Sequence, residues 1–225
     1  MEAQDNEDAG RVPESGRRGR PSAETTRRRM AHLLDVARGI FVRQGYRATT
    51  MDEVAAAAGV TKRTLYAWHR DKQALFRACV IAGAERFPPL QPDAGGNLRA
   101  ALERYVIDLH NELSRADSYG MGLLSLGEAR DFPEMGEAIR RGHFDYMIAP
   151  LAEFLRRHAL EQDGSVERTL LFVAMALSPL HNAMLVGLPL PTPQEVSAHA
   201  CRCVEIFIGG SALSESLGKG HSLRA

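Results

Sequence analysis

Apolar residues recur along this chain with the spacing of an α-helix, and no segment alternates with period two for long enough to form a strand. After Met30 the next apolar positions lie 3, 4, 7, 10 and 11 residues further on, which places them on one helix face. Similar stripes begin at Leu98 and Met135. We therefore expect an all-α protein, and 225 residues, 44% of them apolar, suffice for a sizeable core.

Composition divides the chain into five segments. Residues 1–21 show no apolar period and are rich in Gly, Pro, Arg and acidic residues, so they are expected to be a disordered basic arm. The prolines and glycines from Pro88 to Gly96 would interrupt any helix. The sequence therefore predicts a first helical domain over 22–88, a linker over 89–96, a larger helical domain over 97–210 and a disordered tail over 211–225.

Cysteine number and the apolar segments indicate a cytoplasmic protein. Cys79, Cys201 and Cys203 are an odd number of cysteines, and we find no apolar leader, which argues against a secreted disulfide scaffold. The most apolar stretch, residues 170–190, contains Pro, Gly, His and Asn, which hydrocarbon would not tolerate. We therefore expect this stretch to be a buried helix, with no membrane partner.

The balanced charge of the chain, 28 basic and 28 acidic residues, conceals a strong asymmetry. Residues 11–77 hold 15 basic and 6 acidic side chains, whereas residues 78–225 hold 13 and 18. A basic block of this size in a minority of the chain favours a polyanion as partner.

Two short helices joined by a tight turn are predicted inside this basic block. Thr50 and Glu53 form a capping box that begins the first, and Gly59 follows its last apolar position. Thr61 is placed to cap the second, over 62–69. This layout is that of a helix-turn-helix, whose second helix enters the DNA major groove.

The first turn of the second short helix carries the groups expected to contact bases. Arg63 can donate two hydrogen bonds to guanine, and Thr64 can contact a thymine methyl group. Lys62 and the capping Thr61 complete this turn. We therefore assign Thr61, Lys62, Arg63 and Thr64 to a DNA-binding surface.

The basic arm is a second candidate DNA contact. Arg17, Arg18 and Arg20 precede Pro21 in an extended segment of the kind that enters the minor groove. The alternative is a solvated tail attracted to phosphates without a defined position.

The stretch from Gly19 to Val80 closely resembles the DNA-binding domain of the tetracycline-repressor (TetR) family. The resemblance rests on segments that occur in order and without gaps: Gly19-Arg20-Pro21, Phe41-Val42-Arg43-Gln44-Gly45-Tyr46, Thr50-Met51-Asp52-Glu53-Val54-Ala55, Ala58-Gly59-Val60, Thr64-Leu65-Tyr66 and Asp71-Lys72-Gln73-Ala74-Leu75-Phe76. It implies that the side chains touching phosphates are Thr50, Tyr66, Trp68 and Lys72. His69 stands where the family usually has Phe or Tyr, and it either packs inward or reaches a phosphate.

The resemblance implies a second domain that holds a ligand pocket and a homodimer interface formed mostly by the last two helices. The residues support this, because the segment from Ser165 is apolar nearly all round and the last predicted helix has an apolar edge from Val196 to Phe207. A dimer would also place two recognition helices on the two half-sites of a palindromic operator.

Isolated polar groups and methionines on apolar faces are the candidate ligand contacts in this domain. Each has a competing interpretation as ordinary core, because methionine at helical spacing usually packs inside and a buried histidine usually bonds internally. The candidates are His110, Met121, His143, Met147, Met175, His181 and Met184.

The resemblance and the residues together predict a DNA-binding transcriptional regulator, a repressor that a small apolar effector releases from its operator. One alternative is an activator or a ligand-independent DNA-binding protein of the same fold, and the other is a helical small-molecule enzyme. No motif for metal-dependent hydrolysis, phosphate binding or a nucleophilic serine occurs. Cys201 and Cys203 would lie about 200° apart around a helix, so they cannot share a metal. We expect no enzyme activity, cofactor or metal.

Overall fold

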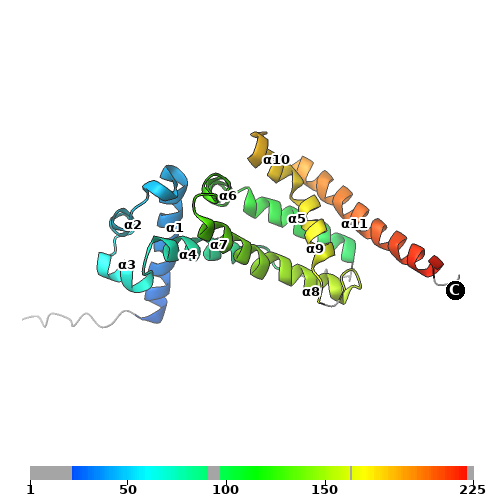
Figure 1. Ribbon diagram of the computed structural model, residues 1–225, viewed down its shortest axis with the longest axis horizontal. Coiled ribbons are helices and arrows are strands. Elements are labelled where there is room, and N and C mark those ends of the chain that lie inside the picture. Colours follow the sequence, from blue (N-terminus) through cyan, green and yellow to red (C-terminus); the bar gives the residue numbers. More distant parts are fainter. Residues whose placement is uncertain (1–21, 91–96, 163, 222–225) are drawn as a thin grey trace, which may run out of the picture.

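A computed structural model describes residues 22–90, 97–162 and 164–221, and for 211–221 the backbone alone. Every regular element in these ranges is helical, which confirms the predicted all-α class. Figure 1 shows the first four helices at one end of an elongated molecule and the end of the last helix at the other. The predicted arm and most of the predicted linker lie outside the described residues.

Four helices form the N-terminal part: α1 (Ala23–Ala48), α2 (Met51–Ala57), α3 (Lys62–Trp68) and α4 (Lys72–Ala84). Side chains cap the starts of all four, because the oxygens of Ser22, Thr50, Thr61 and Asp71 each accept a hydrogen bond from the backbone N–H three residues on. These local signals explain why the predicted starts of α2, α3 and α4 agree with the structure.

An aromatic cluster forms the centre of the N-terminal part. The Phe41 ring stacks on Tyr46 at 5.8 Å between centroids and meets Phe76 edge-on at 5.3 Å. The α-helical path of α1 breaks at Gly45, whose φ of +86° suits glycine and turns Tyr46 into this cluster. Phe132, from beyond α4, also contacts Tyr46, at 4.9 Å, so the cluster extends to the next part of the chain.

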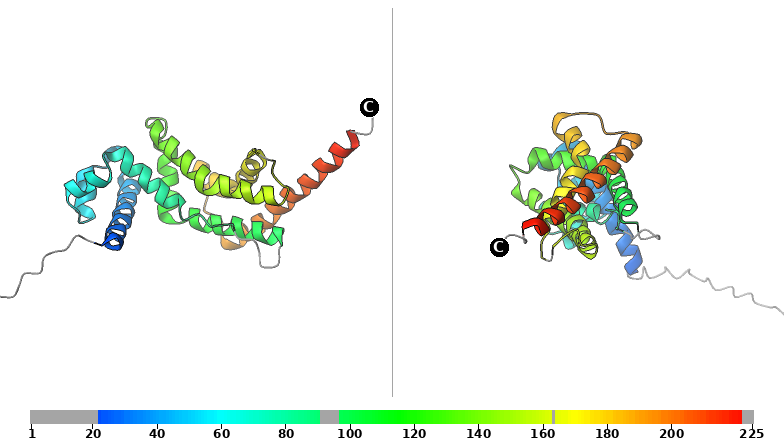
Figure 2. Two further views of the ribbon diagram at one scale, coloured as in Figure 1. Left: turned by 90° about the horizontal axis from the view of Figure 1, so that it is seen from below. Right: turned by 90° about the vertical axis from the view of Figure 1, so that its right-hand side faces the viewer.

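The remaining helices enclose a second core. They are α5 (Leu98–Leu113), α6 (Ala116–Glu128), α7 (Pro133–His143), the π-helical turn η1 (Phe144–Ile148), α8 (Ala149–Arg157), α9 (Glu167–Ala176), α10 (Ser178–Val186) and α11 (Pro193–His221). The core of this part includes Leu102, Leu109, Leu151 and Phe172. Helix α6 contacts α1 and α7 contacts α4, which joins the two parts (Figure 2).

Two of our predictions about the C-terminal helices are wrong. The segment from Ser165 is not one buried helix: it divides at Leu177 into α9 and α10, which are bent by 60°. Pro179, in the first turn of α10, has no N–H to continue the hydrogen bonds of α9. Several of its apolar side chains are exposed on this chain, Leu171 at 60% and Val186 at 70%. These apolar side chains are not covered within the described part of the chain.

The second error concerns the C-terminal end. We predicted a tail without structure over 211–225, but the backbone of α11 continues to His221. Glycine in a helix interior costs only about 1 kcal/mol relative to alanine, so Gly209 and Gly210 do not end it. Helix α6 was also absent from our expectations, because its glycines obscure the apolar period.

By length and composition, no one helix in the described ranges would span a bilayer. Only the bent pair of α9 and α10 passes that criterion when both helices are taken together.

Phe41→Ala is expected to lower the free energy of unfolding by about 3–5 kcal/mol, because the ring is fully buried between Tyr46 and Phe76. Chemical denaturation measures the loss. Phe144→Ala is the matched control, since this ring is 43% exposed. Equal losses in the two variants would contradict the assignment of Phe41 to the centre of the core.

Candidate DNA-binding surface and ligand cavity

Helix α3 presents its first turn to solvent. Thr61 Oγ1 accepts a hydrogen bond from Thr64 N at 3.1 Å, and the buried Leu65 anchors the opposite face of α3. Arg63 is exposed and makes no hydrogen bond or ion pair within the described ranges, whereas Lys62 Nζ lies 2.5 Å from Asp52 Oδ2. The capped helix therefore offers the Arg63 guanidinium as a free donor, with Thr64 beside it.

The predicted phosphate contacts from α2 and α3 all retain some exposed surface. Thr50 is exposed, with its Oγ1 accepting from Glu53 N at 3.2 Å, and Tyr66 is 48% exposed. Trp68 is half-buried and lines a hollow of about 520 Å³ together with Thr61 and Thr64.

Two basic side chains of α1 were missed by the sequence reasoning. Arg29 and His32 line the same hollow as Thr61 and Trp68, so the start of α1 borders the exposed face of α3. The Arg27-Arg28-Arg29 run was a usable signal, since it is one part of the basic block that falls on a predicted helix. The arm residues Arg17, Arg18 and Arg20 lie outside the described residues.

The ammonium group of Lys72, predicted to contact a phosphate, is engaged inside the molecule. Its ammonium donates to three backbone carbonyl oxygens at the end of α1, those of Tyr46 (2.8 Å), Arg47 (3.2 Å) and Thr49 (3.0 Å). It also lies 4.6 Å from the centre of the Tyr46 ring. Because an ammonium has three donors, all are used inside the molecule. Lys72 thus joins the start of α4 to the end of α1.

His69 packs inward. It is the C-cap residue of α3, is 8% exposed, and its Nε2 has no hydrogen-bond partner among the described residues. Burial lowers the pKa of His69 below its ordinary value. The ring is therefore neutral at neutral pH and adds no charge to the candidate DNA-binding surface.

A separate cavity of about 400 Å³ lies where the N-terminal helices meet the C-terminal ones. Helices α1 and α4 form one wall and α6, α7 and α10 the other. Four of the seven candidate ligand contacts line it, namely Met121, His143, His181 and Met184. Most of the remaining lining is aliphatic or aromatic, which suits an apolar ligand.

The other three candidates do not line this cavity. His110 is 1% exposed and its Nε2 lies 2.8 Å from Ala176 O, so it is a buried histidine bonded internally. Met147 belongs to the second core, and Met175 packs against it. Helical period identifies inward-facing residues, but it does not distinguish a filled core from the wall of a cavity.

The comparisons with known proteins agree with this arrangement. The family model for bacterial regulatory proteins of the tetR family matches residues 33–79. The regulator AcrR of Shigella flexneri is 44% identical over 61 residues, 27% of this chain and 26% of AcrR. The activator FasR of Mycolicibacterium smegmatis is 32% identical over 142 residues, 60% of this chain and 57% of FasR. The chain thus spans between a quarter and three fifths of these curated relatives.

Structural similarity extends through both parts of the molecule. A TetR-family regulator from Mesorhizobium loti superimposes with a TM-score of 0.68 and 26% identity, over 82% of this chain and 96% of that one. Fold and surface define the class of the protein as a helix-turn-helix transcriptional regulator. Within that class, residues 33–79 match the tetR-family model, and the fold of both parts is similar to that of a TetR-family regulator.

Lys72→Met is expected to destabilise the fold by about 1.5–3 kcal/mol, because it removes a charged donor from three carbonyl oxygens at the end of α1. Thermal unfolding without DNA measures this effect. Lys62→Met, which removes an exposed lysine, is the control and should change stability by less than about 1 kcal/mol. If Lys72→Met proved as harmless as the control, the structural role of Lys72 would be refuted.

Proposed function

We propose that this chain is a homodimeric repressor that binds a palindromic operator through α3 and is released when a small, largely apolar molecule occupies the cavity. The proposal rests on the unpaired, exposed Arg63 on the first turn of a capped helix. Major-groove edges of guanine are the acceptors that such a guanidinium suits. The division into a DNA-binding part over 22–88 and an effector-binding part over 97–210 belongs to the same proposal, as does a cytoplasmic location.

Phosphate contacts are proposed for the groups around Arg63. Thr50, Tyr66 and Trp68 retain accessible polar or aromatic surface, and Arg29 and His32 extend the surface on α1. Lys72 is proposed to act by holding α4 against α1, because its donors are engaged there. The arm from Arg17 to Arg20 is proposed to add contacts beside the recognition helix.

A second copy of the chain is proposed to cover the exposed apolar side chains of the C-terminal helices. These side chains are Leu170 and Leu171 of α9, Leu185 and Val186 of α10, Leu188 just after α10 and Ile206 of α11. They come from the last helices of the chain, where the resemblance implied a dimer interface. A symmetric dimer formed here would carry two copies of α3 for two half-sites.

Release requires that the effector prefer one arrangement of the two recognition helices. The cavity is suitably placed, because α1 and α4 of the DNA-binding part form one of its walls. A ligand that reversed a 99:1 equilibrium would need about 5.5 kcal/mol of differential affinity. The alternative to repression is activation, and the relative FasR is named as an activator. A reporter gene placed behind the operator separates the two, since a repressor lowers its expression and an activator raises it.

Arg63→Ala is expected to cost about 1–3 kcal/mol on a duplex selected from random DNA, with relaxed preference at one base position in each half-site. Tyr66→Phe removes only a hydroxyl and should weaken selected and random duplexes alike, by about 0.5–1.5 kcal/mol. Fluorescence anisotropy with both duplexes measures the two losses. An Arg63→Ala loss of equal size on both duplexes would overturn its assignment to base recognition.

Ile206→Glu is expected to shift the chain from dimer to monomer, because the charge would be buried without a partner. The dissociation constant of the dimer should rise about ten-fold or more. Sedimentation velocity over a concentration series measures the shift. Glu205→Gln, at the neighbouring exposed position, is the control and should leave the dimer intact. A monomeric wild-type chain, or a dimer insensitive to Ile206→Glu, would exclude this interface.

A further inference from the structure

One charged residue lines the apolar cavity. Arg38, on α1, is the only lysine, arginine, aspartate or glutamate among the described residues that form its wall. The side chain is 4% exposed, so the guanidinium is almost entirely withdrawn from water. Arginine keeps its proton under these conditions, and a buried cation is stable only when anions or acceptors surround it.

The guanidinium of Arg38 has fewer partners than it can use. Nη2 lies 3.0 Å from Asp117 Oδ2 of α6. Nε is fully buried without a hydrogen-bond partner, and no contact joins Nη1 to an acceptor in the described ranges. Arginine has five N–H donors, and buried donors left unpaired cost free energy.

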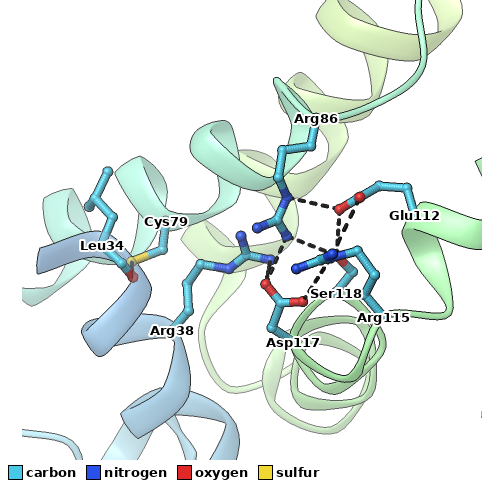
Figure 3. A network of polar contacts seen from close by, with 8 residues as sticks. All are labelled: Leu34, Arg38, Cys79, Arg86, Glu112, Arg115, Asp117 and Ser118. Atoms are coloured by element: carbon cyan, nitrogen blue, oxygen red, sulfur yellow. Dashed lines mark hydrogen bonds and ion pairs between the residues drawn. The ribbon is translucent and has the colours of Figure 1, made fainter. Parts of the chain in front are cut away.

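Asp117 is shared with two further arginines (Figure 3). Arg86 Nη2 lies 2.8 Å from Asp117 Oδ2, and Arg115 Nε lies 3.5 Å from Asp117 Oδ1. Glu112 also pairs with both Arg86, at 2.8 Å, and Arg115, at 3.6 Å. Three cations thus meet two anions in this network. The excess is one positive charge.

The surroundings of Arg38 disfavour its charge. Burial, and next the nearby Arg86, lower the pKa of Arg38, against a smaller opposing effect of Asp117 and weaker ones of Cys79 and the exposed Asp35. Gly83 of α4 lies against the guanidinium, since a Cβ there would be 3.3 Å from Nη2. The absence of a side chain at Gly83 therefore leaves room for Arg38 at the cavity wall.

The other polar groups of the cavity do not supply the missing negative charge. Ser125 donates its hydroxyl to Met121 O at 2.6 Å, and Ser118 lies beside Arg86 and Glu112. Burial lowers the pKa of His143, which is therefore neutral at neutral pH. The remaining wall is apolar apart from His181.

We infer that the cavity takes an amphipathic anion, an apolar molecule with one carboxylate or comparable acidic group, whose charged end pairs with Arg38. This inference deepens the proposed function by naming the class of effector, and it rests on the cavity being the effector site. The apolar body of the ligand would lie among Met121, Met184 and their aliphatic neighbours. Its acidic group would supply the second anion that the buried guanidinium lacks.

A matched pair of probes tests the inference on the full-length protein. Decanoate and decanol have the same apolar chain and differ in charge, so isothermal titration below the micelle concentration isolates the contribution of the anion. We expect decanoate to bind about 10–100 times more tightly than decanol, as a charge-assisted hydrogen bond warrants. Equal or tighter binding of decanol to the wild-type chain would overturn the inference without any variant.

Arg38→Met removes the charge while keeping a long side chain, and Asp117 keeps Arg86 as partner. The preference for decanoate should then disappear. Arg43→Met is the control, because Arg43 is an exposed arginine of the same helix outside the cavity, and it should keep the preference. A preference that survives in folded Arg38→Met, judged by circular dichroism, would contradict the role of Arg38.

Binding of the unliganded chain to a selected duplex, measured in parallel, separates this inference from the proposed function. Duplex binding together with no discrimination between the probes would refute the anionic effector and leave the repressor standing. If the chain bound decanoate more tightly than decanol but retained no duplex, the repressor would be refuted and the anionic ligand of the cavity would stand.

Discussion

The position of α3 depends on a small set of contacts that hold a seven-residue helix in place. An isolated helix of this length is unstable in water, so its geometry comes from its surroundings. Thr61 satisfies its first turn, Leu65 anchors its inner face, and the inward His69 ends it. The exposed face of α3 carries Arg63 and Tyr66. The chemistry we propose for the protein requires that face to stay in one orientation.

Helices α1 and α6 connect the proposed DNA-binding surface to the cavity. Glu128, at the end of α6, accepts a hydrogen bond from Tyr46 N at 3.0 Å, directly after the break in α1 at Gly45. Arg38 of α1 pairs with Asp117 at the start of α6. Helix α6 is therefore attached to α1 at both of its ends, and it also forms part of the cavity wall. A ligand that moved α6 would act on α1, which contacts α2, and α2 in turn contacts α3.

Local signals in the sequence predicted much of the fold. The caps at Thr50, Thr61 and Asp71 operate within three residues, so reading them needed no knowledge of the rest of the chain. The bend before α10 was missed because Pro179 was taken as an interruption within one buried helix, although proline also marks the start of a new one. The end of α11 was misplaced because paired glycines suggested a stop that the helix passes through.

The candidate sites were less accessible to sequence reasoning. Exposed donors such as Arg63 could be assigned, because a capped first turn determines which residues face outward. The partners of Lys72 could not, since they are carbonyl oxygens more than 20 residues away along the chain. His110 and His143 have the same helical pattern, and only tertiary packing places one against Ala176 and the other on the cavity. Arg38 was not recognised as a cavity residue, because its position falls among the apolar residues of one helix face.

The most direct test of the central claim, that α3 lies in the major groove, is DNA cleavage from a tether on that helix. Ala67 is exposed on α3, so Ala67→Cys in a Cys201→Ser background provides one accessible attachment point for an iron chelate beside the buried Cys79 and Cys203. On a selected duplex, we expect two cleavage centres about 10 base pairs apart, one for each half-site. Cleavage spread evenly along the duplex, or none above that of free chelate, would contradict it.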